Sequence, residues 1–285
     1  MSTIIKTHSL QFIQTDVLEP VTQRAIRYLQ AGYSLHLEGP TGIGKTTLAA
    51  HLVQCRQRPS LWMMGGQNTG LPDSASSFKQ ACAEGWTVVY DEFNRSRPDV
   101  NTVLLSAVEP RIVSLISNHD SSDVTIHPEF RVIVTSNAEA YCGTYAVQHA
   151  LLDRLITLRL PEPSILAQQK LLVKLTGISR EQAALIISIV QQFLRQVGPE
   201  RLSSVRPKLM IAKICQRLSI TISADDSEFR QVCRDILLSR SCQSALDANE
   251  VLWELFNQCS RPMPMIEHIP SRLPPTASYA GTSTS

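Results

Sequence analysis

The stretch from Gly39 to Thr46, GPTGIGKT, has the residue types and spacing of a phosphate-binding loop. Glycines let the backbone wrap so that its amide hydrogens converge on anionic oxygens, and the start of the next helix adds a positive dipole end. Lys45 would reach the outer phosphates of a nucleotide, and the Thr46 hydroxyl would bind Mg²⁺. A plain tight turn is the alternative. We expect these residues to contact the nucleotide: Gly39, Pro40, Thr41, Gly42, Ile43, Gly44, Lys45, Thr46 and Thr47.

A second acidic element follows an apolar run in the segment TVVYDEF. Nucleotide hydrolysis needs a carboxylate that holds magnesium and a base or positioner for water. Asp91 suits the first role and Glu92 the second. An acidic pair after a strand is otherwise a solvated strand end, but the neighbouring loop favours the functional interpretation.

Three further residues could act on a bound nucleotide. Asn137 ends the strand-like segment VIVTSN, where it could orient the attacking water or simply cap a turn. Arg154 in ALLDRLITL could form a local ion pair or act as an inserted guanidinium in phosphoryl transfer. Arg206 in SVRPKL raises the same question, and Arg95 and Arg97 could be surface charges or contacts to a neighbouring subunit.

The elements that must position these residues alternate along the first half of the chain. Short apolar runs predict strands at 34–38, 59–64, 86–93, 130–137 and 156–160, and helical spacing predicts helices between them. This order predicts an α/β fold with a mostly parallel sheet covered on both faces. After three residues at 161–163, helical spacing dominates, and Ser179 with Gln182 predicts a capping box. We therefore expect an N-terminal segment and helix (1–31), an α/β domain (32–160), an all-helical domain (161–260) and a disordered tail (261–285).

Composition excludes several classes of protein. The chain has 285 residues, of which 43% are hydrophobic and 18% charged, with a formal net charge of +2, as in ordinary globular proteins. Neither half has the basic excess that would indicate nucleic-acid binding. Seven cysteines without a C-x-x-C pair predict reduced, mostly buried thiols. The N-terminus lacks a signal-peptide pattern and no apolar run could span a membrane, so we expect a cytoplasmic protein without a membrane span.

Taken together, these motifs resemble the AAA+ ATPases of the MoxR type, over residues 12–218. Within that family, YDEFNRSRPDVNTVLLSAVE, HPEFRVIVTSNAEAY and ALLDRLITLRL are similar to a branch involved in gas vesicle assembly. The resemblance implies a sheet in the order 5-1-4-3-2, a helical lid and homo-oligomeric rings, often hexamers. It also implies hydrolysis of ATP with Mg²⁺ at subunit interfaces, and gas vesicle proteins as clients.

The resemblance also implies a role for each candidate residue. It assigns Walker A to Lys45 and Thr46, Walker B to Asp91 and Glu92, sensor 1 to Asn137, an arginine finger acting in trans to Arg154, and sensor 2 to Arg206.

Two other functions stay open at this point. The segment between the second strand and Walker B is shorter than is usual in the family, which favours a nucleotide-gated structural component with little or no hydrolysis. A nucleic-acid motor such as a helicase loader is the second alternative, but the near-neutral charge argues against it.

Overall fold

Five parallel strands form the central sheet of this protein. The computed structural model describes residues 12–66, 75–96, 104–108, 113–117, 120–137, 149–198 and 204–260. The strands are β1 (Leu35–Glu38), β2 (Ser60–Met64), β3 (Thr87–Asp91), β6 (Arg131–Ser136) and β7 (Ile156–Arg159). They lie in the order β2-β3-β6-β1-β7, and every neighbouring pair is parallel. Numbered among themselves in chain order and counted from β7, these strands have the predicted order 5-1-4-3-2.

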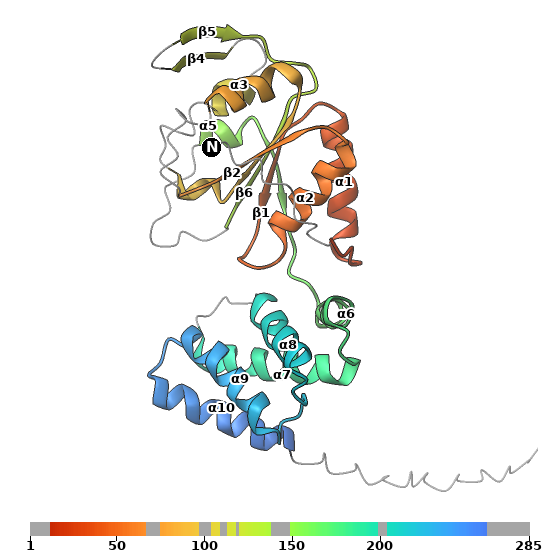
Figure 1. The fold of residues 1–285 in the computed structure, drawn as a ribbon, viewed down its shortest axis with the longest axis vertical. Coiled ribbons are helices and arrows are strands. Elements are labelled where there is room, and N and C mark those ends of the chain that lie inside the picture. The colour runs from red at the N-terminus through yellow and green to blue at the C-terminus, as the bar shows by residue number, and fades with distance from the viewer. Residues whose placement is uncertain are drawn as a thin grey trace, which may run out of the picture.

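Helices cover both faces of this sheet (Figure 1). They are α1 (Glu19–Gln30), α2 (Lys45–Arg56), α3 (Ala75–Glu84) and the short α5 (His149–Leu152), together with a 3₁₀ turn at Phe93–Arg95. Successive side chains of a strand point to opposite faces. In β3, Val88 therefore joins the core cluster that contains Phe78 of α3, whereas Val89 joins the cluster that contains Leu48 of α2.

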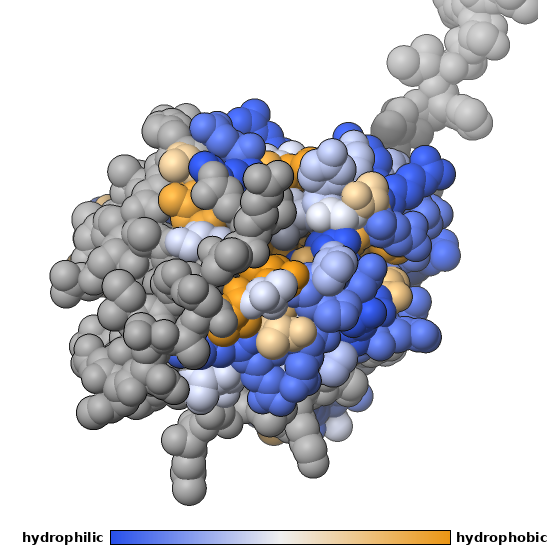
Figure 2. Space-filling view, turned by 90° about the horizontal axis from the view of Figure 1, so that it is seen from above, coloured by the Kyte–Doolittle hydropathy of each residue, from blue (hydrophilic) through white to orange (hydrophobic). Residues whose placement is uncertain are grey.

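An antiparallel hairpin, β4 (Val113–Ser117) and β5 (Asp120–Val124), lies outside the main sheet. The pattern of apolar runs in the sequence did not predict this hairpin. The hairpin contacts α3 and lies at the end of the molecule that is remote from the helical part (Figure 1). Seen from that end, the described surface is mostly hydrophilic with small, separate hydrophobic areas (Figure 2).

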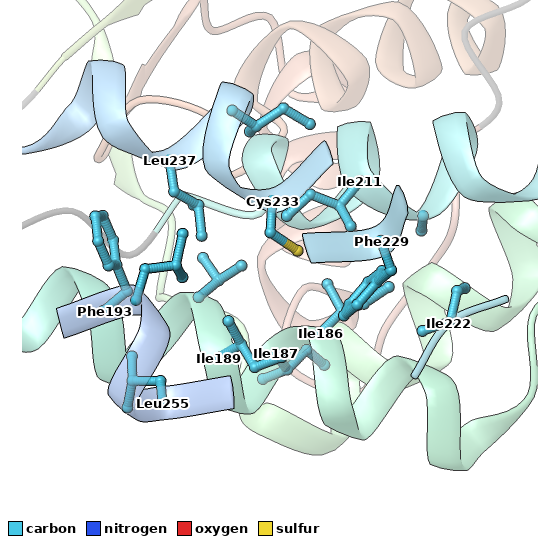
Figure 3. Close-up of a cluster of buried hydrophobic side chains, with 14 of the residues drawn as sticks. Ile186, Ile187, Ile189, Phe193, Ile211, Ile222, Phe229, Cys233, Leu237 and Leu255 are labelled. Carbon is cyan, nitrogen blue, oxygen red and sulfur yellow. The ribbon is translucent and has the colours of Figure 1, made fainter. Parts of the chain in front are cut away.

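The helical part contains five α-helices in the described residues after position 160. They are α6 (Ile165–Thr176), α7 (Arg180–Val197), α8 (Arg206–Leu218), α9 (Ser227–Leu237) and α10 (Ala245–Ser260). The predicted capping box at the start of α7 is confirmed: Ser179 accepts the backbone N–H of Gln182, whose side chain in turn accepts the N–H of Ser179. Figure 3 shows the apolar core of this bundle, with Cys233 pointing in among Phe229 and Ile211.

Of the six described cysteines, three are buried and three are exposed, and all six are free thiols. The prediction of reduced thiols is thus confirmed for these six, whereas the prediction that most are buried is wrong for Cys55, Cys242 and Cys259. Those three lie on helix surfaces or in a connection, where thiols need not pack. Cys142 lies outside the described residues. No helix within the described ranges is both long and apolar enough to cross a membrane.

A buried histidine joins three adjacent strands of the sheet, β6, β1 and β7. His36 of β1 is 2% exposed, with Nδ1 3.0 Å from Thr157 Oγ1 of β7 and Nε2 2.8 Å from Ser136 Oγ of β6. Burial lowers the pKa of His36 to about 4, and the nearby charge of Glu38 opposes this shift. The ring is therefore neutral at pH 7, and each of its nitrogens has a hydroxyl partner.

We expect this histidine to make the protein less stable in mild acid. Its pKa is about 4 when folded but close to the ordinary 6.5 when unfolded, so the unfolded chain binds the proton first. The free energy of unfolding should fall by up to about 1.4 kcal/mol per pH unit from this group between about pH 6.5 and 4. Urea unfolding at pH 7, 6 and 5 measures the slope, which His36→Gln should reduce. An unchanged slope in His36→Gln, or an equal reduction in the control His127→Gln, would contradict this.

Candidate functional site

The candidate site lies at the carboxyl edge of the parallel sheet. The turn between β1 and α2 leaves the sheet at the edge that faces the helical bundle (Figure 1). Since β6 pairs with both β1 and β3 in parallel, the ends of all three strands meet at this edge. Asp91 is the last residue of β3 and Asn137 directly follows β6. Residues far apart in the sequence are thereby brought to one loop.

The loop needs its glycines for two different reasons. Gly42 and Gly44 have φ angles of 81° and 101°, which side chains of L-residues rarely adopt. A Cβ at Gly44 would meet no atom within 4 Å, so conformation alone requires glycine there. A Cβ at Gly39 would instead lie 2.5 Å from Ile43 Cδ1 and 3.3 Å from the carbonyl oxygen of Leu160. Glycine is therefore required by backbone conformation at Gly44 and by close packing at Gly39.

Not every residue of the predicted loop faces the open turn. Ile43 is 6% exposed and belongs to the core cluster beneath the sheet, so its side chain anchors the loop. Thr41 and Thr47 are half-buried. Ile43 could therefore contact a ligand only through its backbone.

Lys45 is the most constrained side chain of the site. It is 6% exposed, and its Nζ donates to the carbonyl oxygens of Gly39 (2.7 Å) and Pro40 (2.8 Å) and to Asn137 Oδ1 (2.9 Å). All three acceptors are neutral. The ammonium group is thus held across the mouth of the loop, and no described residue forms an ion pair with it in direct contact.

The surroundings of Lys45 shift its pKa in opposite directions. Burial lowers the pKa of Lys45 to about 8, the charges of Asp91 and Glu92 raise it, and that of Arg206 lowers it further. An anion with several negative charges would relieve this burial cost, because it supplies the opposite charge that the carbonyl groups lack.

Asp91 is held by two hydroxyl groups. Thr46 Oγ1 lies 2.8 and 3.0 Å from the two carboxylate oxygens, and Thr135 Oγ1 donates to Oδ1 at 2.5 Å. Thr135 also accepts the backbone N–H of Glu92 at 2.9 Å. Sequence reasoning missed Thr135, although its place in the segment VTSN, one strand away from Asp91, offered a signal.

The donor set of Thr46 and Asp91 fits Mg²⁺. A hydroxyl oxygen and a carboxylate are hard ligands, and magnesium in nucleotide sites takes one or two protein carboxylates and completes its shell with phosphates and water. Within the described ranges, no cluster of three or more histidine, cysteine, aspartate and glutamate residues could hold a metal alone. Any metal at this edge would therefore share its ligands with a bound nucleotide.

Glu92 adopts a left-handed backbone conformation with φ of 53°. Its carboxylate forms an ion pair with Arg95, with Oε2 3.2 Å from Nε. A Cβ at position 65 would lie 2.0 Å from the carbonyl oxygen of Glu92. Any side chain there would clash, so glycine is required where the chain leaves β2 beside Glu92. The motif search missed Gly65, although the pair of glycines directly after a predicted strand was visible in the sequence.

The two candidate arginines lie in different places. The start of α8 reaches the loop: a Cβ at Gly42 would lie 2.2 Å from Ser204 Oγ and 3.6 Å from Arg206 Cβ. Arg206 therefore stands beside the turn that holds Lys45. Arg154 lies just after α5 and before β7, half-buried, with Nη1 2.6 Å from the carbonyl oxygen of Ala150. Arg97 lies outside the described residues.

Comparisons with known proteins agree with this geometry. The model of the AAA domain (dynein-related subfamily) matches residues 34–155. The gas vesicle ATPase GvpN of Ancylobacter aquaticus is 34% identical over 262 residues, which cover 80% of this chain and 73% of that protein. GvpN of Haloferax mediterranei is 30% identical over 84% of this chain and 77% of that protein. GvpN2 of Halobacterium salinarum is 29% identical over 81% and 76%.

Solved structures show the same fold at low sequence identity. A variant of RuvB from Thermotoga maritima has a TM-score of 0.52 and 16% identity, covering 87% of this chain and 71% of that one. A second RuvB variant has a TM-score of 0.51 and 17% identity over 77% and 74%. On the sequence match to the proteins named GvpN, together with the AAA domain and this fold, the chain belongs to the gas vesicle ATPase GvpN family.

Proposed function

We propose that this chain is an AAA+ ATPase that binds and hydrolyses ATP and thereby remodels or chaperones proteins during gas vesicle assembly. The relatives named gas vesicle ATPases support the role, and the AAA domain supports the chemistry. One observation carries the proposal. Lys45 Nζ donates to Asn137 across the loop, and the next residue, Thr46, donates to Asp91. An ammonium, an amide and a metal-binding oxygen pair then face one anion.

In this proposal each residue has a distinct task. Lys45 exchanges its carbonyl partners for phosphate oxygens, and preorganised backbone amides of the loop stabilise charge that develops during transfer. Thr46 and Asp91 would hold Mg²⁺, which would neutralise phosphate charge when bound. Glu92 aligns the attacking water, which requires its carboxylate to leave Arg95. Asn137 stays within reach of Lys45 and senses the outermost phosphate.

The remaining assignments concern assembly and location. We propose a homo-oligomeric ring, hexameric by resemblance to the family, in which Arg154 of one subunit completes the site of its neighbour. Residues 32–160 would form the ATPase domain and residues 161–260 the lid, which moves with nucleotide state through Arg206. Gas vesicle proteins would be the clients, with the ring in the cytoplasm and in contact with gas vesicles.

Nucleotide binding should take up protons near pH 8. The pKa of Lys45 is about 8 in the free protein, and phosphate charge raises it, so binding of MgATP at pH 8 should take up about half a proton. Titration calorimetry in buffers with different ionisation enthalpies measures this number. At pH 6.5 the uptake should nearly vanish, because Lys45 is already protonated. Equal uptake at both pH values would show that another group titrates.

Replacing the water-positioning carboxylate should separate binding from turnover. Glu92→Gln should bind MgATP with near-normal affinity but hydrolyse it at least about 100-fold more slowly, since an amide cannot accept the proton. Lys45→Ala should lose binding itself. Calorimetry and steady-state phosphate release measure the two properties. Normal turnover in Glu92→Gln would refute its role, and wild-type binding without turnover, with or without gas vesicle proteins, would favour a nucleotide-gated scaffold.

Mixed subunits test whether Arg154 acts across an interface. Arg154→Ala subunits can bind ATP but lack the arginine, whereas Lys45→Ala subunits cannot bind ATP but supply it. If the site is shared, mixtures of these two inactive proteins should regain part of the phosphate release. Mixtures of Arg154→Ala with doubly substituted Lys45→Ala, Arg154→Ala subunits are the control. No recovery at any ratio would place Arg154 outside a shared site.

A further inference from the structure

A pocket between α9 and α10 has no part in the nucleotide site. Both helices lie in the part of the bundle that is remote from the sheet (Figure 1). Residues spaced three or four apart on each helix line it, among them Arg230 and Arg234 on α9 and Leu252, Trp253 and Phe256 on α10. Helical spacing places each set on one face, so the two faces meet as the walls of a single groove.

The apolar wall of this groove comes from α10. Leu252 and Phe256 are 1% and 3% exposed and connect the groove to the core of the bundle. The Trp253 side chain between them in sequence is 49% exposed. The exposed Trp253 ring beside the buried Leu252 and Phe256 side chains offers a partner a large contact area, and ordering this ring costs little entropy.

Arg230 is a fixed part of the wall. Its Cζ lies 4.9 Å from the Trp253 ring centre and 5.4 Å from that of Phe256, and its Nε donates to the carbonyl oxygen of Ala224. Its Nη2 lies 3.9 Å from Asp225 Oδ1, so the guanidinium charge is partly compensated. These contacts preorganise the groove, which lowers the entropy cost of binding.

Arg234 lies one helical turn further along α9 and is exposed. Among the described residues its guanidinium has no hydrogen-bond or ion-pair partner. By contrast, the neighbouring Gln231 donates to Asp235 at 2.8 Å. The groove thus combines an uncompensated guanidinium with an aromatic and aliphatic wall, and its chemical complement is a carboxylate next to an apolar side chain.

We propose that this groove binds a short segment of a partner protein, with a single glutamate or aspartate carboxylate on Arg234 and a neighbouring apolar side chain against Trp253. A polyanion such as nucleic acid fits poorly, because Glu250 and Glu254 flank Trp253 on α10 and Asp225 lines the other end. The site is separate from the nucleotide loop, so binding there does not depend on ATP hydrolysis.

Fluorescence anisotropy of a labelled peptide tests this proposal. The probe is a short fluorescein-labelled peptide with a single glutamate between leucines, titrated with the full-length protein in the absence of nucleotide. We expect saturable binding that weakens at least about tenfold in Arg234→Gln, because a charge-assisted hydrogen bond is lost. Trp253→Ala should weaken it similarly. Matched controls are Arg217→Gln, an exposed arginine at the end of α8, and Leu246→Ala, an exposed leucine at the start of α10.

Four results would overturn the proposal. They are absence of saturable binding, equal binding of a peptide with glutamine in place of glutamate, equal weakening by Arg217→Gln and Arg234→Gln, and binding that appears only after residues 261–285 are removed. The last would mean that the chain itself occupies the groove. Lys45→Ala should bind the peptide as the wild type does, so failure of this proposal and failure of ATP binding are observed separately.

Discussion

The burial of one ammonium group is the interaction on which the site depends. Lys45 is held by two backbone carbonyls and one amide oxygen, none of which carries a charge. A buried cation with neutral partners keeps much of its desolvation cost, and its pKa is lowered accordingly. The free site therefore stores an unfavourable electrostatic state that a polyphosphate relieves. Binding energy and specificity for a highly charged anion would then come from the same feature.

The parallel sheet is what makes that arrangement possible. Because β3, β6 and β1 are adjacent and parallel, their carboxyl ends deliver Asp91, Asn137 and the loop to one edge. Thr135 and His36 then fix the relative positions of these strand ends through hydroxyl and imidazole hydrogen bonds. These contacts link residues 44 and 100 positions apart in sequence, so they stabilise the site only once the sheet has formed.

Much of this fold and of the candidate loop could be predicted from the sequence, because its signals are local. The spacing of α7 and its Ser179 cap depend on neighbouring residues, and so do the glycines of the loop. The β4–β5 hairpin could not be predicted in this way, since the Asp120–Val124 strand is largely polar and is defined by pairing with its partner. Gly65 and His36 were missed for a related reason: their importance lies in contacts with Glu92 and Ser136, which lie far away in the sequence.

The contact between the loop and the start of α8 would give nucleotide state, under the proposed function, a physical route to domain arrangement. Gly42 leaves room for the Ser204 hydroxyl, and Arg206 influences the pKa of Lys45 from the same side. Two cations beside one loop repel each other when no anion is bound, and both are attracted when one is. A phosphate group therefore favours the arrangement with Arg206 close to the loop, and its loss favours separation. Since α8, α9 and α10 pack on one core, any such movement of Arg206 would carry the groove beside Trp253 with it.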